Sequence, residues 1–246
     1  MKGVILAGGT GTRLQPLTKL LNKHLLPVGR KPMILYGIES LRRAGITDIL
    51  LVIGTHSAGL YTDYLGSGKE WGVQITYRIQ EAAGGIAEAL EAARTFIYPD
   101  EKFVVLLGDN LFTDELTTYV KHYLQQPPGT ARVLLKHVDD PRRYGVAVFD
   151  PDQPKLIQRI EEKPADPLSN YCVTGIYMYD TEVFNKISNI QASARGELEI
   201  TDVNNLYAAS GNLEYDILQG WWSDAGTFES LEEASRKMNR NYKKRK

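Results

Sequence analysis

Five short apolar runs recur along the chain, and segments with helical spacing separate most of them. The runs have the length of buried strands and span residues 4–7, 49–54, 73–79, 103–107 and 132–138. Strands that alternate with helices form a largely parallel sheet, because each helical crossover packs back onto a face of that sheet. The pattern therefore predicts an α/β fold with helices on both faces of the sheet.

Two helices can be placed within this alternation, and a third closes it. Residues 31–45 have Pro32 near the start and Gly45 where a left-handed cap would fall. Residues 84–96 are rich in strong helix formers. A last helical stretch is expected over residues 228–241.

A cluster of structure-breaking residues at 125–130 precedes shorter pieces with more proline. We interpret the change as a second lobe of one domain, because polar motifs fall on both sides of it. The prediction is a single domain over 1–246, with a first lobe to about residue 125 and a second lobe from about 130 to 226.

The charge and cysteine content restrict the possible partners and compartment. With 29 Lys and Arg against 30 Asp and Glu, the net charge is −1, so the whole molecule has no general attraction for nucleic acid or acidic membranes. The apolar runs are far shorter than the roughly 20 residues that span a bilayer, and the first residues lack the hydrophobic core of a signal peptide. Cys172 is the only cysteine, which suits a reducing compartment. We expect a cytoplasmic protein.

A glycine-rich turn, LAGGTGTRL, follows the first apolar run and occupies residues 6–14. Glycine lets backbone N–H groups approach an anion closely, since no Cβ stands in the way. The spacing lacks the third Gly or Ala of the dinucleotide fingerprint and the Gly-Lys-Ser/Thr of the P-loop. A tight turn without a ligand would explain the glycines, but not Arg13 followed ten residues later by Lys23. The turn therefore favours a phosphate site of another kind.

Four further motifs carry charged side chains. Asp109 follows a buried strand in LLGDN, at the sheet edge where ligands of α/β proteins gather, and could hold Mg²⁺ or merely open a turn. RIEEKP contains Glu162 and Lys163, a weak signal because charged strand ends are common. Arg195 precedes an acidic helix start in ARGELEITDVN, and Asp224 lies between aromatics and glycine in WWSDAGT.

Together with LAGGTGTRLQPLT, NKHLLPVGRKPM, YGVAVFD and VTGIYMYD, these motifs resemble those of the nucleoside triphosphate:sugar-1-phosphate nucleotidylyltransferases, and within that family the glucose-1-phosphate thymidylyltransferases. They occur in the family's order from residue 3 to about residue 235. The resemblance implies a Rossmann-like three-layer α/β/α sandwich with a mixed, mostly parallel central sheet. It also implies Mg²⁺-dependent transfer of a thymidylyl group from dTTP to α-D-glucose 1-phosphate, giving dTDP-glucose and pyrophosphate for dTDP-L-rhamnose or other deoxysugar synthesis. A homo-oligomer is implied as well.

The resemblance assigns roles to the charged motifs. Arg13 would hold the departing pyrophosphate and Lys23 the α-phosphate, Asp109 and Asp224 would bind Mg²⁺, and Lys163 and Arg195 would hold the sugar phosphate. The other nucleotide-binding positions implied are Leu6, Gly8, Gly9, Thr10, Gly11, Thr12, Gln80 and Gly85, of which Gly8, Gln80 and Gly85 would read the pyrimidine edge. The other sugar-phosphate positions are Asn110, Tyr144, Gly145, Glu162, Val173 and Thr174.

One segment departs from the family's pattern. Where the family commonly has QPxPxGLAQA, this chain has QEAAGGIAEA, so that both prolines are absent, Gly84 precedes Gly85 and Glu88 replaces a glutamine. Glycine widens the conformations open to a loop, so thymidine selectivity is less secure than the reaction type. A uridylyltransferase or an enzyme of broad specificity remains an alternative, and a non-catalytic sugar-nucleotide sensor is a remote one.

Overall fold

The computed structural model describes residues 1–244, and for residues 241–244 the backbone alone. Within this part of the chain, nine strands join in one sheet: β1 (Lys2–Ala7), β4 (Asp48–Gly54), β5 (Gln74–Gln80), β6 (Phe103–Leu107), β8 (Ala131–His137), β9 (Gly145–Phe149), β10 (Ile157–Glu162), β11 (Tyr171–Tyr179) and β12 (Leu213–Ile217). The α-helices are α1 (Ile34–Arg43), α2 (Ala58–Leu65), α3 (Ile86–Glu91), α4 (Leu116–Leu124), α5 (Glu182–Ile187), α6 (Ile200–Ala209) and α7 (Phe228–Lys244). Short pieces complete the fold: strands β2 (Pro27–Val28), β3 (Lys31–Pro32), β7 (Leu111–Phe112) and β13 (Trp222–Ser223), and 3₁₀ turns at Thr12–Leu14, Leu17–Lys19, Lys23–Leu25, Thr55–Ser57 and Lys69–Trp71.

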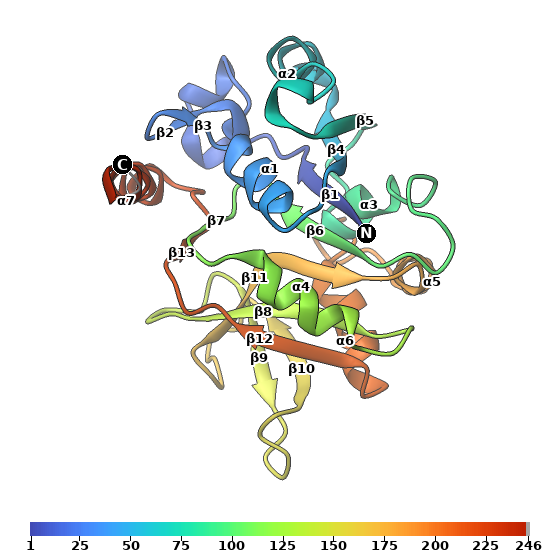
Figure 1. The fold of residues 1–246 in the computed structure, drawn as a ribbon. Helices are drawn as coiled ribbons and strands as arrows, with labels where there is room; N and C mark the ends of the chain where they lie inside the picture. The colour runs from blue at the N-terminus through green and yellow to red at the C-terminus, as the bar shows by residue number, and fades with distance from the viewer. Residues whose placement is uncertain (245–246) are drawn as a thin grey trace.

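The sheet is mixed, and its parallel strands lie together. Strands β5, β4, β1 and β6 are neighbours in that order and all run parallel. β11 then pairs antiparallel with β6, and also with β8 and β9, while β10 extends the sheet beyond β9 and β12 runs parallel to β8 (Figure 1). Each of the five predicted apolar runs is a strand. The prediction of a mixed α/β sheet is therefore confirmed.

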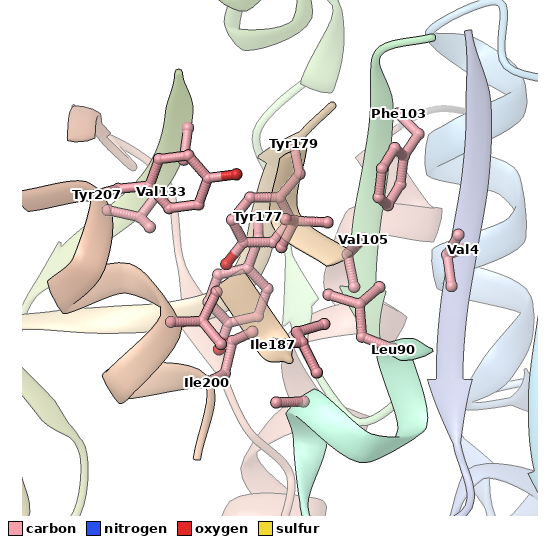
Figure 2. Packing of buried hydrophobic residues seen from close by; sticks show 14 of the residues in the cluster. Val4, Leu90, Phe103, Val105, Val133, Tyr177, Tyr179, Ile187, Ile200 and Tyr207 are labelled. Atoms are coloured by element: carbon pink, nitrogen blue, oxygen red, sulfur yellow. The ribbon is translucent and has the colours of Figure 1, made fainter. Parts of the chain in front are cut away.

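Helices cover both faces of the sheet, as the alternation predicts. Along β4, Leu50 and Val52 pack into a core with α3, α5 and α6, whereas Leu51 and Ile53 pack into a second core with α1, α2 and α4. The alternation follows from the pleat, which turns successive side chains to opposite faces. Figure 2 shows the first core, in which the ring of Tyr179 stacks between those of Tyr177 and Tyr207 at centroid distances of 6.0 and 5.9 Å. The three-layer prediction is confirmed.

The helix predicted over residues 31–45 is α1, which begins later than predicted, at Ile34, because Lys31 and Pro32 form strand β3, and which ends as its sequence indicates. Gly45 has φ 80°, and the N–H of Ile46 donates to the carbonyl of Leu41 at 2.9 Å, which is a left-handed glycine cap. The helix predicted over residues 84–96 is shorter, because α3 ends at Glu91 and the chain continues in tight turns to Phe96. The last helix, α7, begins at Phe228 as expected.

The sheet runs through both predicted lobes, because β6 from the first pairs with β11 from the second. A third, small core lies apart from the sheet and packs α7 against β2 and β7. Its buried members are Val28, Met33, Leu111, Ala225, Ala234 and Met238. Among the described residues, no helix is both long enough and apolar enough to cross a membrane.

Candidate active site

Two neighbouring parallel strands bring the first predicted residues together. Leu6 of β1 is paired with Leu107 of β6, so the glycine turn and Asp109 leave the sheet at the same edge. Lys23, from the 3₁₀ turn that follows the glycine segment, forms an ion pair with the Asp109 carboxylate. The two side chains are only 13 % and 15 % exposed. We call this group, with the glycine turn and His24, the β1–β6 side of the site.

A cavity of about 300 Å³ opens at this edge of the sheet. It brings together ten of the predicted residues: Leu6, Gly8, Gly9, Lys23, Gln80, Gly85, Asp109, Glu162, Lys163 and Arg195. It is also lined by residues that the sequence did not single out as binding residues: His24, Ala83, Ile86, Ala89, Leu107, Glu197 and Glu199.

The glycine turn presents unpaired donors. In the described chain, no hydrogen bond is donated by the backbone N–H groups of Gly9, Thr10 and Gly11. The carbonyl groups of the turn are held instead, that of Gly11 by the Thr18 hydroxyl at 2.8 Å and that of Gly9 by the Asn22 amide at 3.2 Å. A turn held through its carbonyls, with its N–H groups free, has the form of an anion site.

Asn22 also fixes the neighbouring histidine. Its Oδ1 accepts from the backbone N–H of His24 at 3.0 Å and from Tyr61 OH at 2.9 Å, and it lies 2.7 Å from His24 Nδ1. Because an amide oxygen only accepts, Nδ1 of His24 carries the proton. Burial, together with the charge of Lys23, lowers the pKa of His24 from 6.5 to about 3. The ring is therefore a neutral wall of the cavity at physiological pH.

Asp109 is oriented by its neighbour in sequence. Burial alone would raise the pKa of Asp109, but the ammonium of Lys23 and hydrogen bonds from Lys23 and Asn110 bring it below its ordinary value. Asn110 Nδ2 donates to Asp109 Oδ1 at 2.9 Å, while Asn110 Oδ1 accepts from Gly175 N at 2.8 Å and from Trp222 Nε1 at 2.7 Å. Asn110 is 5 % exposed and lines a different cavity, of about 400 Å³. In this structure its side chain positions Asp109.

The opposite side of the cavity carries a network of exposed ion pairs, which we call the β10–α6 side. Lys163 Nζ lies 2.9 Å from Glu162 Oε1, and Arg195 Nη2 lies 2.8 Å from Glu199 Oε1 and 3.7 Å from Glu162 Oε1. Thr201, on the first turn of α6, donates to Glu162 Oε2 at 2.7 Å. Lys163 has φ 47°, a left-handed conformation that is costly for a residue with a Cβ.

The segment expected to read the base is hydrogen-bonded to the β10–α6 side. The N–H of Leu198 donates to the Gly84 carbonyl at 2.7 Å, and the N–H of Ala87 donates to the Leu198 carbonyl at 3.1 Å. Gly85 has φ 101°, and a Cβ there would lie 2.5 Å from the Leu198 carbonyl oxygen. Glycine is therefore required where this segment passes Leu198.

Two predicted residues lie close to Gly226, outside the cavity lining. A Cβ at Gly226 would lie 2.9 Å from Arg13 Nη2 and 3.3 Å from Asp224 Oδ2, so both side chains border Gly226. Ala225, directly after Asp224, is fully buried with φ 39°. The tightly packed, left-handed residue fixes the direction in which the chain leaves Asp224.

The remaining predicted residues lie around these two groups. Tyr144 packs edge-on against Trp222 at 5.4 Å, and burial raises its pKa to about 12. A Cβ at Gly145 would lie 3.4 Å from Glu162 Oε2. Thr174 is fully buried and its hydroxyl donates to the Leu134 carbonyl at 2.8 Å, while Val173 packs against the first core. Thr10 and Thr12 are exposed on the glycine turn.

Comparison with known proteins assigns the chain and its fold to one family. The sequence profile of the family described as nucleotidyl transferase matches residues 2–241. The chain belongs to the nucleotidyl transferase family. The transferase is 44 % identical over 236 residues to the glucose-1-phosphate thymidylyltransferase of Xanthomonas campestris pv. campestris, covering 95 % of this chain and 79 % of that protein. It is 42 % identical over 238 residues to the enzyme of the same name from Mycobacterium tuberculosis, covering 96 % and 81 %.

Solved structures agree with the sequence relatives. A Bacillus anthracis protein described as a glucose-1-phosphate thymidylyltransferase, in complex with a sucrose, superposes on the transferase with a TM-score of 0.91 at 51 % identity, covering 97 % of this chain and 95 % of that one. A UDP-glucose pyrophosphorylase complexed with UDP-glucose superposes with a TM-score of 0.85 at 25 % identity, covering 98 % of each chain.

Some cavity residues of the transferase were missed by sequence reasoning. His24 stands beside Lys23 in NKHLL, and this adjacency is the signal that could have marked it. Glu199 was interpreted only as one of several acids in a helix start, yet it lines the cavity and pairs with Arg195. Its contact depends on how the loop before α6 folds back, which no sequence spacing specifies.

Proposed function

We propose that this protein transfers a thymidylyl group from dTTP to α-D-glucose 1-phosphate, releasing pyrophosphate and forming dTDP-glucose. The observation that carries the proposal is one cavity with unpaired backbone donors and Lys23 on its β1–β6 side and with Lys163 and Arg195 on its β10–α6 side. Two phosphate-bearing substrates can thus bind at opposite walls. The named relatives at 42–44 % identity support the choice of thymidylyl and glucosyl groups.

The chemistry is a displacement at phosphorus. An oxygen of the sugar phosphate forms a bond to the α-phosphorus of the nucleotide, and the bond between that phosphorus and the bridging oxygen breaks, so that pyrophosphate leaves with its electron pair. The protein forms no covalent bond in this step. Its contribution is to position two polyanions and to neutralise the charge that develops. Lys23 would leave Asp109 and bind the α-phosphate, Arg13 would hold the pyrophosphate, and Lys163 with Arg195 would hold the sugar phosphate.

The charges of the cavity support a divalent cation. Its described lining has three cationic side chains, Lys23, Lys163 and Arg195, against four carboxylates, Asp109, Glu162, Glu197 and Glu199. Such a lining does not by itself offset the charge of a nucleoside triphosphate and a sugar phosphate. Among the described residues, no cluster of three or more His, Cys, Asp and Glu forms a complete metal cage. Mg²⁺ suits this arrangement, since it binds through one or two carboxylates together with substrate phosphates and water.

Asp109 and Asp224 are the residues that would hold Mg²⁺. Asp109 lines the cavity and offers hard carboxylate oxygens once Lys23 withdraws, and Asp224 lies beside Arg13. When bound, the ion would polarise phosphate oxygens as a Lewis acid. The pairing of Asp109 with Lys23 in the free protein holds both side chains in place, and phosphate and metal would replace the two partners.

Uridylyl transfer is a second candidate, because the UDP-glucose pyrophosphorylase structure shares the fold at 25 % identity. A sugar-nucleotide sensor is less well supported, since a binding module has no need of both charged walls. A cytoplasmic location and a homo-oligomer remain predictions from the sequence.

The proposal is tested by pyrophosphate release from purified protein with glucose 1-phosphate and Mg²⁺, in parallel with dTTP, UTP, CTP, ATP and GTP. We expect strong preference for dTTP. Equal use of dTTP and UTP would support nucleotidylyl transfer but would contradict the assignment to the thymidylyl group. A folded protein that releases no pyrophosphate with any nucleotide would favour the sugar-nucleotide sensor.

A further inference from the structure

Glu88, on the first turn of α3, is hydrogen-bonded to the residue expected to read the base. Gln80 Nε2 donates to Glu88 Oε2 at 2.5 Å and lies 3.4 Å from the Gly85 carbonyl oxygen. A carboxylate and a backbone carbonyl only accept hydrogen bonds. The NH₂ end of the Gln80 amide must therefore face Glu88 and Gly85, and its oxygen must face the other way.

Because residue 84 has no side chain, the side chain of Glu88 has room to lie against it. A Cβ at Gly84 would lie 3.1 Å from Cγ, Cδ and Oε2 of Glu88, closer than ordinary van der Waals contact. Gly84 and Glu88 are two of the departures from the family's usual pattern in this segment. The structure joins them in one arrangement, since the glycine leaves room for the carboxylate that holds Gln80.

The oxygen of the Gln80 amide lies at the cavity wall. A Cβ at Gly8 would be 2.3 Å from Gln80 Oε1, and Gly8, Gln80 and Gly85 all line the cavity. Glu88 is absent from the described lining residues, so it acts behind Gln80. The amide thus presents an acceptor to whatever occupies this end of the cavity, while its donor end is engaged.

We propose that Glu88, seated over Gly84, is a positioning residue that fixes the Gln80 amide with its oxygen toward the base, so that the site accepts only a pyrimidine with an N–H on its pairing edge. The inference rests on the proposed function. Thymine and uracil carry a hydrogen on N3, which the Gln80 oxygen can accept. Cytosine has a lone pair at N3, so two acceptors would face each other and the desolvated pair would be left without a hydrogen bond.

The test compares dTTP with dCTP, which share the same sugar, by measuring kcat/KM for pyrophosphate release with glucose 1-phosphate. In Glu88→Gln the neutral amide at residue 88 can face Gln80 with either its oxygen or its NH₂ group. The Gln80 amide can then flip, so that its oxygen and its NH₂ group exchange places. We expect the ratio of dTTP to dCTP use to fall by about tenfold or more, the value of one hydrogen bond. Gly84→Ala should lower the ratio in the same direction, because it displaces the Glu88 side chain. The double variant Gly84→Ala with Glu88→Gln should lower the ratio of dTTP to dCTP use little more than Glu88→Gln alone.

Two controls separate this role from general damage. Glu91→Gln removes a carboxylate from the same helix, where Glu91 pairs with the exposed Arg94, and should leave the ratio unchanged. The ratio of dTTP to UTP should stay constant in every variant, since both bases carry the N3 hydrogen. Equilibrium binding of dTTP and dCTP by calorimetry gives the same comparison for any variant with slow turnover.

An unchanged dTTP to dCTP ratio in Glu88→Gln, with dTTP turnover retained, would overturn the inference and leave the proposed function standing. Use of dCTP as well as dTTP by the unaltered protein would also overturn it. An unaltered protein that uses no nucleotide would remove the proposed function and this inference with it, a result that the dTTP measurement alone reveals.

Discussion

Lys23 and Asp109 on the β1–β6 side, and Lys163 and Arg195 on the β10–α6 side, are ion-paired alike but buried to different degrees. The first two side chains are 13 % and 15 % exposed, the second two 45 % and 48 %. Around the first pair the supporting groups are neutral, since Asn110 donates to Asp109 and Asn22 fixes the buried ring of His24 beside Lys23. Around Arg195 they are charged: the carboxylates of Glu162 and Glu197 are about one third exposed, and that of Glu199 is 14 % exposed. Buried charges lose more when unpaired than exposed ones do.

The difference indicates that one wall is preformed and the other rearranges. The β1–β6 side is held by two parallel strands and by the amides of Asn22 and Asn110, each of which has several hydrogen-bond partners. On the β10–α6 side, Arg195 lies within 4 Å of three carboxylates, Glu162, Glu197 and Glu199, in an arrangement that a bound phosphate can replace at little cost. We therefore expect substitutions on the first wall to affect turnover and stability, and those on the second to affect substrate affinity.

The largest effect is expected at the buried pair. Asp109→Asn should lower kcat by about 10³-fold, because it removes a charge that holds Lys23 and would bind the metal, as losses of preorganised electrostatic groups commonly do. Asp224→Asn should act in the same direction. Pyrophosphate release measures the change, and Asp63→Asn, an exposed carboxylate on α2, is the matched control. Full activity of both Asp109→Asn and Asp224→Asn would refute the metal assignment.

The pH dependence of stability tests how deeply His24 is buried on the β1–β6 side. Its folded pKa of about 3 lies below the ordinary 6.5, so between these pH values the unfolded chain binds a proton that the folded chain does not. Its contribution to stability is complete above pH 6.5 and is lost as the pH falls toward 3, by about 1.4 kcal/mol per pH unit. The unfolding free energy in urea should therefore fall between pH 7 and pH 4.5 by roughly 2–3 kcal/mol more in the unaltered protein than in His24→Gln. An equal fall in unfolding free energy with pH in the two proteins would contradict a buried, neutral His24 ring.

On the exposed wall, Arg195→Ala should raise the KM for glucose 1-phosphate by about 10-fold, because one charge-assisted contact to phosphate is lost. Its melting temperature should stay within about 2 °C of the original, since exposed ion pairs contribute little. Arg159→Ala, an equally exposed arginine that pairs with Glu161 on β10, should change neither quantity. A clear loss of stability with an unaltered KM would make the Arg195 network structural.

The smallest effect is expected at Cys172, which is fully buried on β11 and whose pKa burial raises to about 12. A buried, protonated thiol is a poor nucleophile. The native protein should therefore react with a thiol reagent at pH 8 far more slowly than the same protein in denaturant. Rapid labelling of the native protein would show that the sheet between the two walls opens.

Sequence predicted five of the nine strands that the described residues form in the sheet, because a continuous apolar run marks a strand buried on both faces. The resemblance of the motifs to those of the family grouped Lys23, Asp109, Lys163 and Arg195 in one site, and the structure brings all four to the cavity. It did not single out Asn22, and it gave Asn110 only a sugar-phosphate role, whereas in the structure both amides make contacts with residues far along the chain, such as Tyr61 and Trp222. Nor could it pair Gln80 with Glu88, since that contact depends on how tightly the chain turns at Gly84 before α3 begins.

The small core beneath α7 has a consequence for how this protein can vary. Val28 lies five residues after Lys23, Leu111 two after Asp109, and Ala225 one after Asp224, and all three pack with Ala234 and Met238 of α7. One helix therefore touches the chain just behind three of the charged residues. Small changes in side-chain volume at Ala234 or Met238 should therefore shift the backbone of the site without changing any of its polar groups. Directed evolution could use these two positions to adjust the geometry of the site from a distance.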